Sequence, residues 1–212
     1  MNKNEKFVIA INRELGSGGR TVGRKLAEKL GVEFYDKAVI KGLQEKFHLT
    51  VEEIEKLKGR QQGWWADFKR HMAGIGPSPN FYIPMKNFEP DMLDTDVVFE
   101  IETEILKGIA ETESCVVAGR SGFFIFRDHP NHVSILIQAS MPFRVERVSR
   151  KQNMTEEEAR KTIEKIDKMR ENYVKQYTMT SRYDTRNYDL VVRADGKTED
   201  DLVDIIMQFI SK

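Results

Sequence analysis

The sequence contains little of what marks a secreted or membrane-bound protein. Its 212 residues include one cysteine, Cys115, so no disulfide can form within the chain. The apolar run nearest the N-terminus, Phe7–Ile11, is too short for the core of a signal peptide. No run approaches the ~20 apolar residues that a membrane-spanning helix needs. We therefore expect a cytoplasmic protein with no membrane partner.

The chain also lacks a net charge and a recognisable set of metal ligands. Lys and Arg total 34, and Asp and Glu total 34, so no overall electrostatic field favours nucleic acid as a partner. Any anion-binding site must therefore rest on a local cluster of charges. The histidines have no spacing typical of a metal site, so we expect structural roles for all of them: His48, His71, His129 and His132.

Short segments rich in Val and Ile alternate with helical patterns along the chain. Strands are predicted at Lys6–Ile11, Val32–Asp36, Cys115–Gly119, His132–Ala139 and Asp189–Ala194. Helices are predicted at Thr21–Leu30, Ala38–Lys46, Asp96–Glu111, Pro142–Lys151, Thr155–Tyr177 and Thr198–Ile210. Thr155 and Glu158 have the spacing of a capping box. The alternation predicts an α/β fold, with a parallel sheet and helices on both faces, in a single domain over residues 1–212.

Ligands of parallel α/β sheets bind at the carboxyl ends of the strands. That rule places four segments along one rim: Asn12–Arg20, Asp36, Gly119–Gly122 and Ser140–Arg144. The stretch at about 59–94, which holds both tryptophans, Trp64 and Trp65, breaks the alternation of strands and helices. We interpret it as an insertion that lies over the rim; a surface loop with one short helix is the alternative.

The segment ELGSGGRT, Glu14–Thr21, lies between the first predicted strand and the first predicted helix. A phosphate-binding loop needs small residues whose backbone N–H groups can point at oxygen atoms, and a helix that begins directly afterwards. In the register G-x-x-x-x-G-K-[ST], Glu14 replaces the first glycine, Arg20 replaces the lysine, and Thr21 occupies the Mg²⁺-coordinating position. We therefore predict phosphate binding by Gly16, Ser17, Gly18, Gly19, Arg20 and Thr21.

Two other interpretations of this loop stay open. Its first two glycines also fit the dinucleotide fingerprint G-x-G-x-x-G, with Asp36 placed for a ribose, although threonine stands at the third glycine position. A glycine-rich turn that binds nothing is the other interpretation. Glu14 would repel phosphates unless its carboxylate points away, holds the metal, or pairs with a cation such as Arg13 or Arg20.

Arginines further along the chain favour phosphoryl transfer over hydride transfer. Arg120 directly follows a predicted strand on the rim. Arg144, Arg147 and Lys151 share one face of the next predicted helix, with Arg150 adjoining them. Such a stripe fits a basic lid over phosphates, or else a solvated surface. Phosphoryl transfer is catalysed mostly by positioning and by neutralising charge, which a rim rich in arginine can supply.

Several motifs together resemble the cytidylate kinase-like branch of the P-loop nucleoside-monophosphate kinases. They are INRELGSGGR, KLGVEFYDK, AGRSG, FRVER, IDKMRENY and NYDLVV, and they span nearly the whole chain. The resemblance implies a parallel five-stranded sheet, an ATP site at the glycine loop, Mg²⁺ assisted by Thr21, and a mobile arginine-bearing lid at about 147–158. The implied function is ATP-dependent phosphoryl transfer to a small-molecule nucleotide, expected to be a (deoxy)cytidine monophosphate-type acceptor.

The resemblance also implies roles for individual residues. Catalytic roles fall on Arg20, Arg120, Arg147, Arg150, Asp167 and Arg170, and the acceptor side is lined by Asp36, Arg120, Asp167 and Arg170. Ser121 replaces the aspartate of the G-R-D sequence in this kinase family. Glu14 or Asp36 would then have to supply the carboxylate that holds the metal.

Two rival hypotheses keep the fold and change the function. The first is a nucleotide-binding module without turnover, because the changes at Glu14, Arg20 and Ser121 each weaken a usual catalytic contact. The second is the same reaction on another phosphorylated or hydroxylated metabolite, because the aromatic residues of the insertion (Trp64, Trp65, Phe81 and Tyr82) leave acceptor specificity undetermined.

Overall fold

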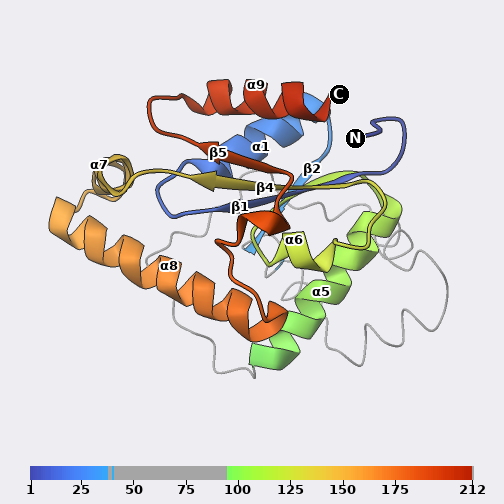
Figure 1. Ribbon diagram of the computed structural model, residues 1–212, viewed down its shortest axis with the longest axis horizontal. Helices are drawn as coiled ribbons and strands as arrows, with labels where there is room; N and C mark the ends of the chain where they lie inside the picture. The colour runs from blue at the N-terminus through green and yellow to red at the C-terminus, as the bar shows by residue number, and fades with distance from the viewer. Residues whose placement is uncertain (38–39, 41–94, 212) are drawn as a thin grey trace, which may run out of the picture.

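A computed structural model describes residues 1–37, 40 and 95–211 of the chain. The insertion expected at about 59–94, and the helix expected at Ala38–Lys46 apart from Ile40, lie outside the described residues. Within them the strands form one parallel sheet in the order β2-β3-β1-β4-β5 (Figure 1). The strands are β1 (Val8–Arg13), β2 (Glu33–Asp36), β3 (Cys115–Ala118), β4 (His132–Gln138) and β5 (Leu190–Arg193). The five predicted strands and the α/β fold class are confirmed, with small shifts at the strand ends.

Helices connect the strands and cover the sheet. They are α1 (Gly19–Leu30), α5 (Thr95–Thr112), α6 (Gly122–Ile125), α7 (Met141–Gln152), α8 (Glu156–Thr178) and α9 (Glu199–Ile210), with a short 3-10 helix, η2 (Thr185–Asn187). Five of these match predicted helices. The sequence predicted neither α6 nor η2, because an element of three or four residues is too short to show a hydrophobic period.

The two faces of the sheet are covered by different helices. Ile9 and Ile11 of β1 pack in the cluster that includes α1 and α9, whereas Val8 and Ala10 pack in the cluster that includes α5 (Figure 1). Successive side chains of a strand point to opposite faces, so an uninterrupted apolar run is buried on both sides. This is the arrangement expected of a parallel sheet.

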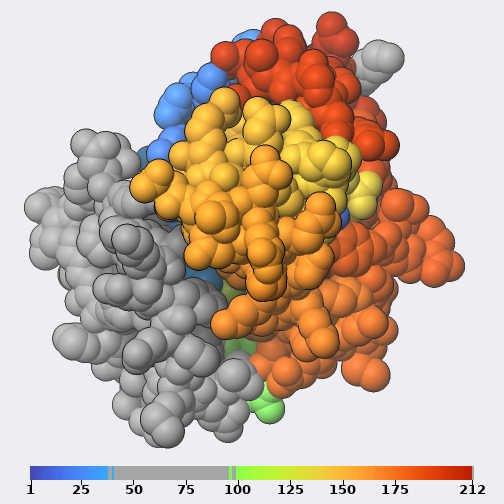
Figure 2. Space-filling model, turned by 90° about the vertical axis from the view of Figure 1, so that its left-hand side faces the viewer, coloured from blue at the N-terminus to red at the C-terminus, as the bar shows by residue number. Residues whose placement is uncertain are grey.

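A third apolar cluster joins α7 and α8 to the glycine loop. Val145 and Val148 of α7 pack against Ala159 and Ile163 of α8, and Leu15 of the loop packs against this cluster. Figure 2, which views this end of the molecule, shows α7 and α8 as one continuous surface with α9 above them. The lid expected at about 147–158 covers the end of α7, the turn and the start of α8; its closure stays a prediction, as does the single-domain assignment.

The helix starts differ in how their backbone N–H groups are satisfied. Thr155 and Glu158 form the predicted capping box of α8, Thr198 and Asp201 form another at α9, and Ser140 caps α7. In α1 the cap is Gly18, no side chain accepts a hydrogen bond there, and the first turn has no acid. Neither the cap nor an acid of the first turn therefore offers a side-chain acceptor to the N–H groups at the start of α1, which lies at the carboxyl end of β1, where ligands of such sheets bind.

Candidate phosphate-binding site

The glycine loop between β1 and α1 has a conformation that requires glycine at two positions. Gly16 and Gly18 have φ angles of 87° and 84°, in the left-handed region that favours glycine. A β-carbon at Gly16 would also lie 2.9 Å from both the β-carbon and the carbonyl oxygen of Arg144. Ser17 is buried, and its hydroxyl donates a hydrogen bond of 3.0 Å to the carbonyl of Glu14. The loop is therefore closed by its own backbone and packed tightly against α7.

Glu14 faces away from the inside of this loop. Its Oε2 accepts a hydrogen bond of 2.9 Å from the backbone N–H of Ala139 and lies 3.8 Å from Nε of Arg144. Of the arrangements that the sequence left open, the carboxylate adopts the one that points outward. It does so beside Arg144 rather than beside Arg13 or Arg20. Its charge is thus directed toward the turn between β4 and α7.

Asp167 of α8 braces the outer side of the loop. Its Oδ1 accepts a hydrogen bond of 3.1 Å from the N–H of Leu15, and its Oδ2 accepts one of 2.5 Å from Arg144. Arg170 lies one turn further along α8, and its Nη1 is 3.6 Å from Oδ1 of Asp167. Burial lowers the pKa of the Arg170 guanidinium to about 10. Asp167 therefore connects α7, α8 and the loop.

Arg182 is a buried residue of this site that the sequence analysis missed. Its guanidinium donates a hydrogen bond to the carbonyl of Arg13 and another, of 3.4 Å, to Oδ1 of Asn12. Its Nη1 also lies 3.5 Å from Oδ1 of Asp167. Arg182 follows α8 in an irregular segment and belongs to no motif, so no local pattern could have placed it under the end of β1.

Arg20 and Asp36 form an ion pair across the rim. Nε of Arg20 lies 2.5 Å from Oδ2 of Asp36, and the Asp36 side chain is 4% exposed. Both residues were predicted site residues. The structure brings together Arg20, at the start of α1, and Asp36, the last residue of β2. The role of Arg20 as the replacement for the loop lysine stays a prediction.

Arg120 lies in the turn after β3 and is held by groups from two helices. Its backbone is left-handed, with φ of 54°. The guanidinium pairs with the buried Glu102 of α5 and donates a hydrogen bond of 2.8 Å to the hydroxyl of Tyr173 on α8. Burial lowers the pKa of Arg120 and raises that of Tyr173. Arg120, predicted to line the acceptor side, is thus already paired with a carboxylate of the chain itself.

The predicted basic stripe on α7 divides into three environments. Arg144 is buried beneath the loop, where it pairs with Asp167. Arg147 lies over the loop: its guanidinium carbon is 3.4 Å from the position of a β-carbon on Gly18, and it pairs with Glu199. Arg150 and Lys151 are exposed. The four cations of α7 therefore do not form one continuous basic surface.

The comparison with protein families bears on the interpretations of the loop. The sequence model of the family described as "Cytidylate kinase-like family" matches residues 8–195. The chain belongs to the cytidylate kinase-like family. This membership confirms the resemblance seen in the motifs and favours a phosphate loop over a dinucleotide fingerprint or a bare turn.

Solved structures share the fold of this cytidylate kinase-like protein at low sequence identity. An uncharacterized protein from Eubacterium ventriosum is 24% identical, with a TM-score of 0.70, over 98% of this chain and 99% of that one. Shikimate kinase from Bacteroides thetaiotaomicron is 16% identical, with a TM-score of 0.52, over 97% of this chain and 99% of that one. Among curated proteins, no sequence matches this chain significantly.

The residues of the rim fit the Mg²⁺ that P-loop kinases generally use. In the described part of the chain, no group of three or more His, Cys, Asp or Glu residues is placed to hold a metal ion. Kinase Mg²⁺ sites need no such cage, because substrate phosphates and water supply most of the oxygen ligands. Thr21 can provide a hydroxyl and Asp36 a carboxylate, which are the donors that Mg²⁺ prefers. Glu14 faces away, so Asp36 is the better candidate of the two carboxylates.

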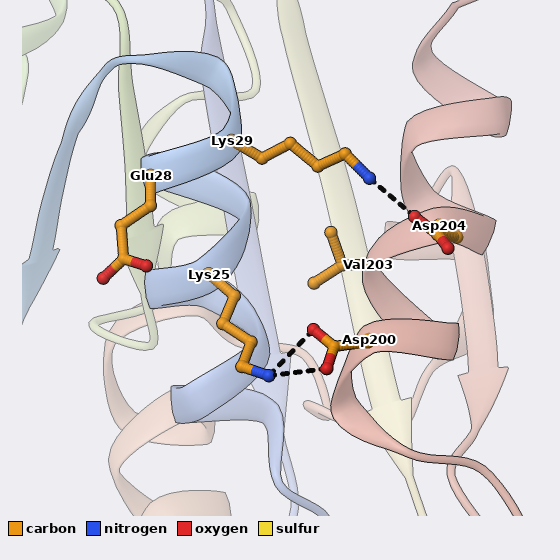
Figure 3. Close-up of a pocket in the computed structure, with 6 residues that line it drawn as sticks. All are labelled: Lys25, Glu28, Lys29, Asp200, Val203 and Asp204. Atoms are coloured by element: carbon orange, nitrogen blue, oxygen red, sulfur yellow. Dashed lines mark hydrogen bonds and ion pairs between the residues drawn. The ribbon is translucent and has the colours of Figure 1, made fainter.

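A surface groove between α1 and α9 lies away from the loop. Lys25 pairs with Asp200 at 2.8 Å, Lys29 pairs with Asp204 at 2.6 Å, and Val203 lies between the two pairs (Figure 3). Such exposed ion pairs contribute little to stability, because water and salt screen them. Ion pairing between the two helices accounts for these residues.

No helix in the described ranges has the length and apolar character needed to cross a membrane.

Proposed function

We propose that this cytidylate kinase-like protein transfers the γ-phosphoryl group of ATP to a small acceptor, a (deoxy)cytidine monophosphate-type nucleotide. The observation that carries the proposal is the glycine loop at the uncapped start of α1. Gly16 and Gly18 hold left-handed backbone conformations directly before the first turn of α1, and the Gly18 cap offers no side-chain acceptor to the N–H groups of that turn. An anion is favoured there by those N–H groups and by the helix dipole.

In this proposal the backbone of Gly16–Thr21 binds the phosphates of the nucleotide. Thr21 and Asp36 would hold Mg²⁺, which would neutralise phosphate charge when bound, and Asp36 would then share its carboxylate between the ion and Arg20. An oxygen of the acceptor phosphate attacks the γ-phosphorus, the bond to the β,γ-bridging oxygen breaks, and ADP leaves with the electron pair. Arg147 and Arg150 neutralise the transferring group when the lid closes.

The acceptor side is proposed to include Asp36, Arg120, Asp167 and Arg170. Asp167 and Arg170 act there through the loop that they brace, since both contact residues of the β1–α1 segment. Arg120 would have to exchange Glu102 for the acceptor phosphate. A guanidinium binds a carboxylate and a phosphate in the same forked geometry, so the exchange replaces one anion by another.

A second candidate function is nucleotide binding without turnover. Arg120 and Arg147 are each paired with a carboxylate of the chain, and the buried Ser121 hydroxyl has no hydrogen-bond partner within the described residues. These contacts favour a site that binds phosphates but presents fewer available cations to a transition state.

ADP formation distinguishes the two functions. The assay contains ATP, Mg²⁺ and one acceptor at a time, from a panel of nucleoside monophosphates and hydroxylated metabolites. We expect CMP or dCMP to give the highest rate above the acceptor-free control. A protein that binds ATP but forms ADP with no acceptor would be a binding module. Arg186→Ala is a suitable control variant, because the Arg186 side chain is 87% exposed and pairs with Asp184 away from the loop.

A further inference from the structure

Arg13, the last residue of β1, has a guanidinium without a partner among the residues that the structure describes. Within the described residues it makes no side-chain hydrogen bond and no ion pair, although the residue is half-buried. Its side chain runs along the glycine loop and crosses to β3. A side chain at Gly119, the residue after β3, would overlap with Nη1 of Arg13. The guanidinium therefore lies at the rim, between the loop and the end of β3.

The charges around Arg13 are mostly of its own sign. Arg20, Arg170 and Arg182 all disfavour its protonated form, and Asp36, the carboxylate that favours it, is already paired with Arg20. Burial, with Arg170 as the next largest cause, lowers the pKa of Arg13 to about 9. Enclosed charges in proteins are normally paired or bound to a ligand. Within the described residues, the half-buried Arg13 guanidinium has cations as its main charged neighbours and no carboxylate of its own.

The positions of Arg13 and Gly19 suggest which anion belongs there. Gly18 is the left-handed cap and Gly19 is the first residue of α1. If the register is shifted by one residue, so that Gly18 is the final glycine of G-x-x-x-x-G-K-[ST], Arg13 stands at the first glycine, Gly19 at the lysine and Arg20 at the Ser/Thr position. Thr21 then lies one residue beyond the motif, and its hydroxyl would reach Mg²⁺ from there. A β-carbon on Gly19 would lie 2.6 Å from the β-carbon of Arg13. The two side chains exclude each other, so a cation at position 13 requires glycine at position 19.

We propose that Arg13 supplies the cation of the phosphate loop and binds the terminal phosphate of a nucleoside triphosphate, in place of the loop lysine. This inference rests on the proposed function, because it names the residue that holds the transferred group. The guanidinium points to the β3 side, where Asp36 and Arg120 belong to the acceptor half of the rim. A planar guanidinium can bind two oxygens of one phosphate. The sequence assigned this role to Arg20, whose guanidinium is held by Asp36.

Binding measurements on Arg13→Met test the assignment. The probes are ATP, ADP and inorganic tripolyphosphate, measured by calorimetry with Arg20→Ala for comparison and Arg186→Met as the exposed control. We expect Arg13→Met to weaken ATP and tripolyphosphate binding by about tenfold or more, and ADP binding by less than about threefold, as for loss of a charge-assisted contact to the terminal phosphate. Equal affinities in wild type and Arg13→Met would overturn the proposal, as would a large loss confined to Arg20→Ala.

Thermal unfolding without ligand separates binding from a structural role. Arg13→Met removes a half-buried cation that has no partner among the described residues, so the melting temperature is expected to stay the same or rise, while stabilisation by added ATP is lost. A structural arginine would give a lower melting temperature. The exchange Arg13→Gly with Gly19→Lys should restore binding of tripolyphosphate, whereas Gly19→Lys alone should abolish it. If the folded double variant does not bind tripolyphosphate, a lysine at position 19 cannot replace Arg13, and the proposed exchange of the cation between these two positions is contradicted.

The outcomes also distinguish this inference from the proposed function. If tripolyphosphate binds in an Arg13-dependent way but no acceptor yields ADP, the transfer reaction is wrong and the role of Arg13 stands. If wild type transfers phosphoryl groups and Arg13→Met binds ATP with unchanged affinity, the role of Arg13 is wrong and the reaction stands. Absence of binding to both ATP and tripolyphosphate in wild type contradicts both.

Discussion

Glu14 and Ala139 are joined by a hydrogen bond of 2.9 Å between the glutamate carboxylate and the alanine backbone N–H. The two residues lie 125 positions apart in the sequence. This contact turns the one acidic residue of the glycine loop toward the turn between β4 and α7. An anion inside the loop therefore does not meet the carboxylate that its sequence position would suggest.

Glu14→Ala is expected to lower the free energy of unfolding by about 1 to 3 kcal/mol, because a largely buried N–H loses its acceptor. Arg144 also loses a nearby carboxylate. Glu14→Gln keeps an amide oxygen for Ala139 and should lose less stability. Urea denaturation of both variants measures the difference. If Glu14 held the metal instead, both variants would lose Mg²⁺-dependent ATP binding and keep their stability.

Gly16→Ala should abolish nucleotide binding and destabilise the fold. The added β-carbon meets Arg144 at 2.9 Å, and the backbone has φ of 87°. Gly31→Ala is a matched control, because Gly31 has φ of 67° and nothing lies within 4 Å of an added β-carbon. The control should lose only about 1 kcal/mol to backbone strain and should bind ATP normally. Equal effects of the two substitutions on ATP affinity would show that close packing of the loop on α7 is unimportant.

Asp167→Asn tests whether Asp167 braces the loop or takes part in transfer. The asparagine can still accept the hydrogen bond from Leu15 but loses its charge against Arg144 and Arg182. Removing one partner of a buried ion pair lowers stability by about 3 to 5 kcal/mol. We expect unfolding at lower urea concentration, together with weaker ATP binding. Unchanged stability with abolished turnover would instead support a direct role at the acceptor phosphate.

His132 should make the fold sensitive to acid. Burial lowers the pKa of its imidazole from 6.5 to about 4. The unfolded chain therefore binds a proton near pH 6.5 that the folded chain does not bind until about pH 4. This contribution to stability is present above pH 6.5 and is lost as the pH falls from 6.5 to 4. Urea denaturation across this range, compared with His132→Leu, measures it; identical pH profiles would contradict the burial of a neutral imidazole.

The strands and most helices could be predicted because local patterns determine them. The run Val8–Ile11 is apolar without interruption, which indicates a strand buried on both faces, and Thr155 with Glu158 marks a helix start. The glycines of the loop also form a local pattern, and their spacing alone predicts a phosphate site.

The detail of the site could not be predicted because it depends on contacts between distant segments. Arg182 reaches the carbonyl of Arg13 across 169 positions, and Asp167 reaches the N–H of Leu15 across 152. The sequence could suggest that Arg13 or Arg20 pairs with Glu14. Only the packed structure shows that Arg20 pairs with Asp36 and that Arg13 has no partner among the described residues.

Product analysis tests the central claim most directly. Wild type and Gly16→Ala are incubated with ATP, CMP and Mg²⁺, and the phosphorus NMR spectrum is followed over time. The account predicts that wild type produces CDP and ADP in equal amounts and that Gly16→Ala produces neither. ATP loss that does not depend on CMP, or CDP formation that persists in Gly16→Ala, would contradict phosphoryl transfer at the glycine loop.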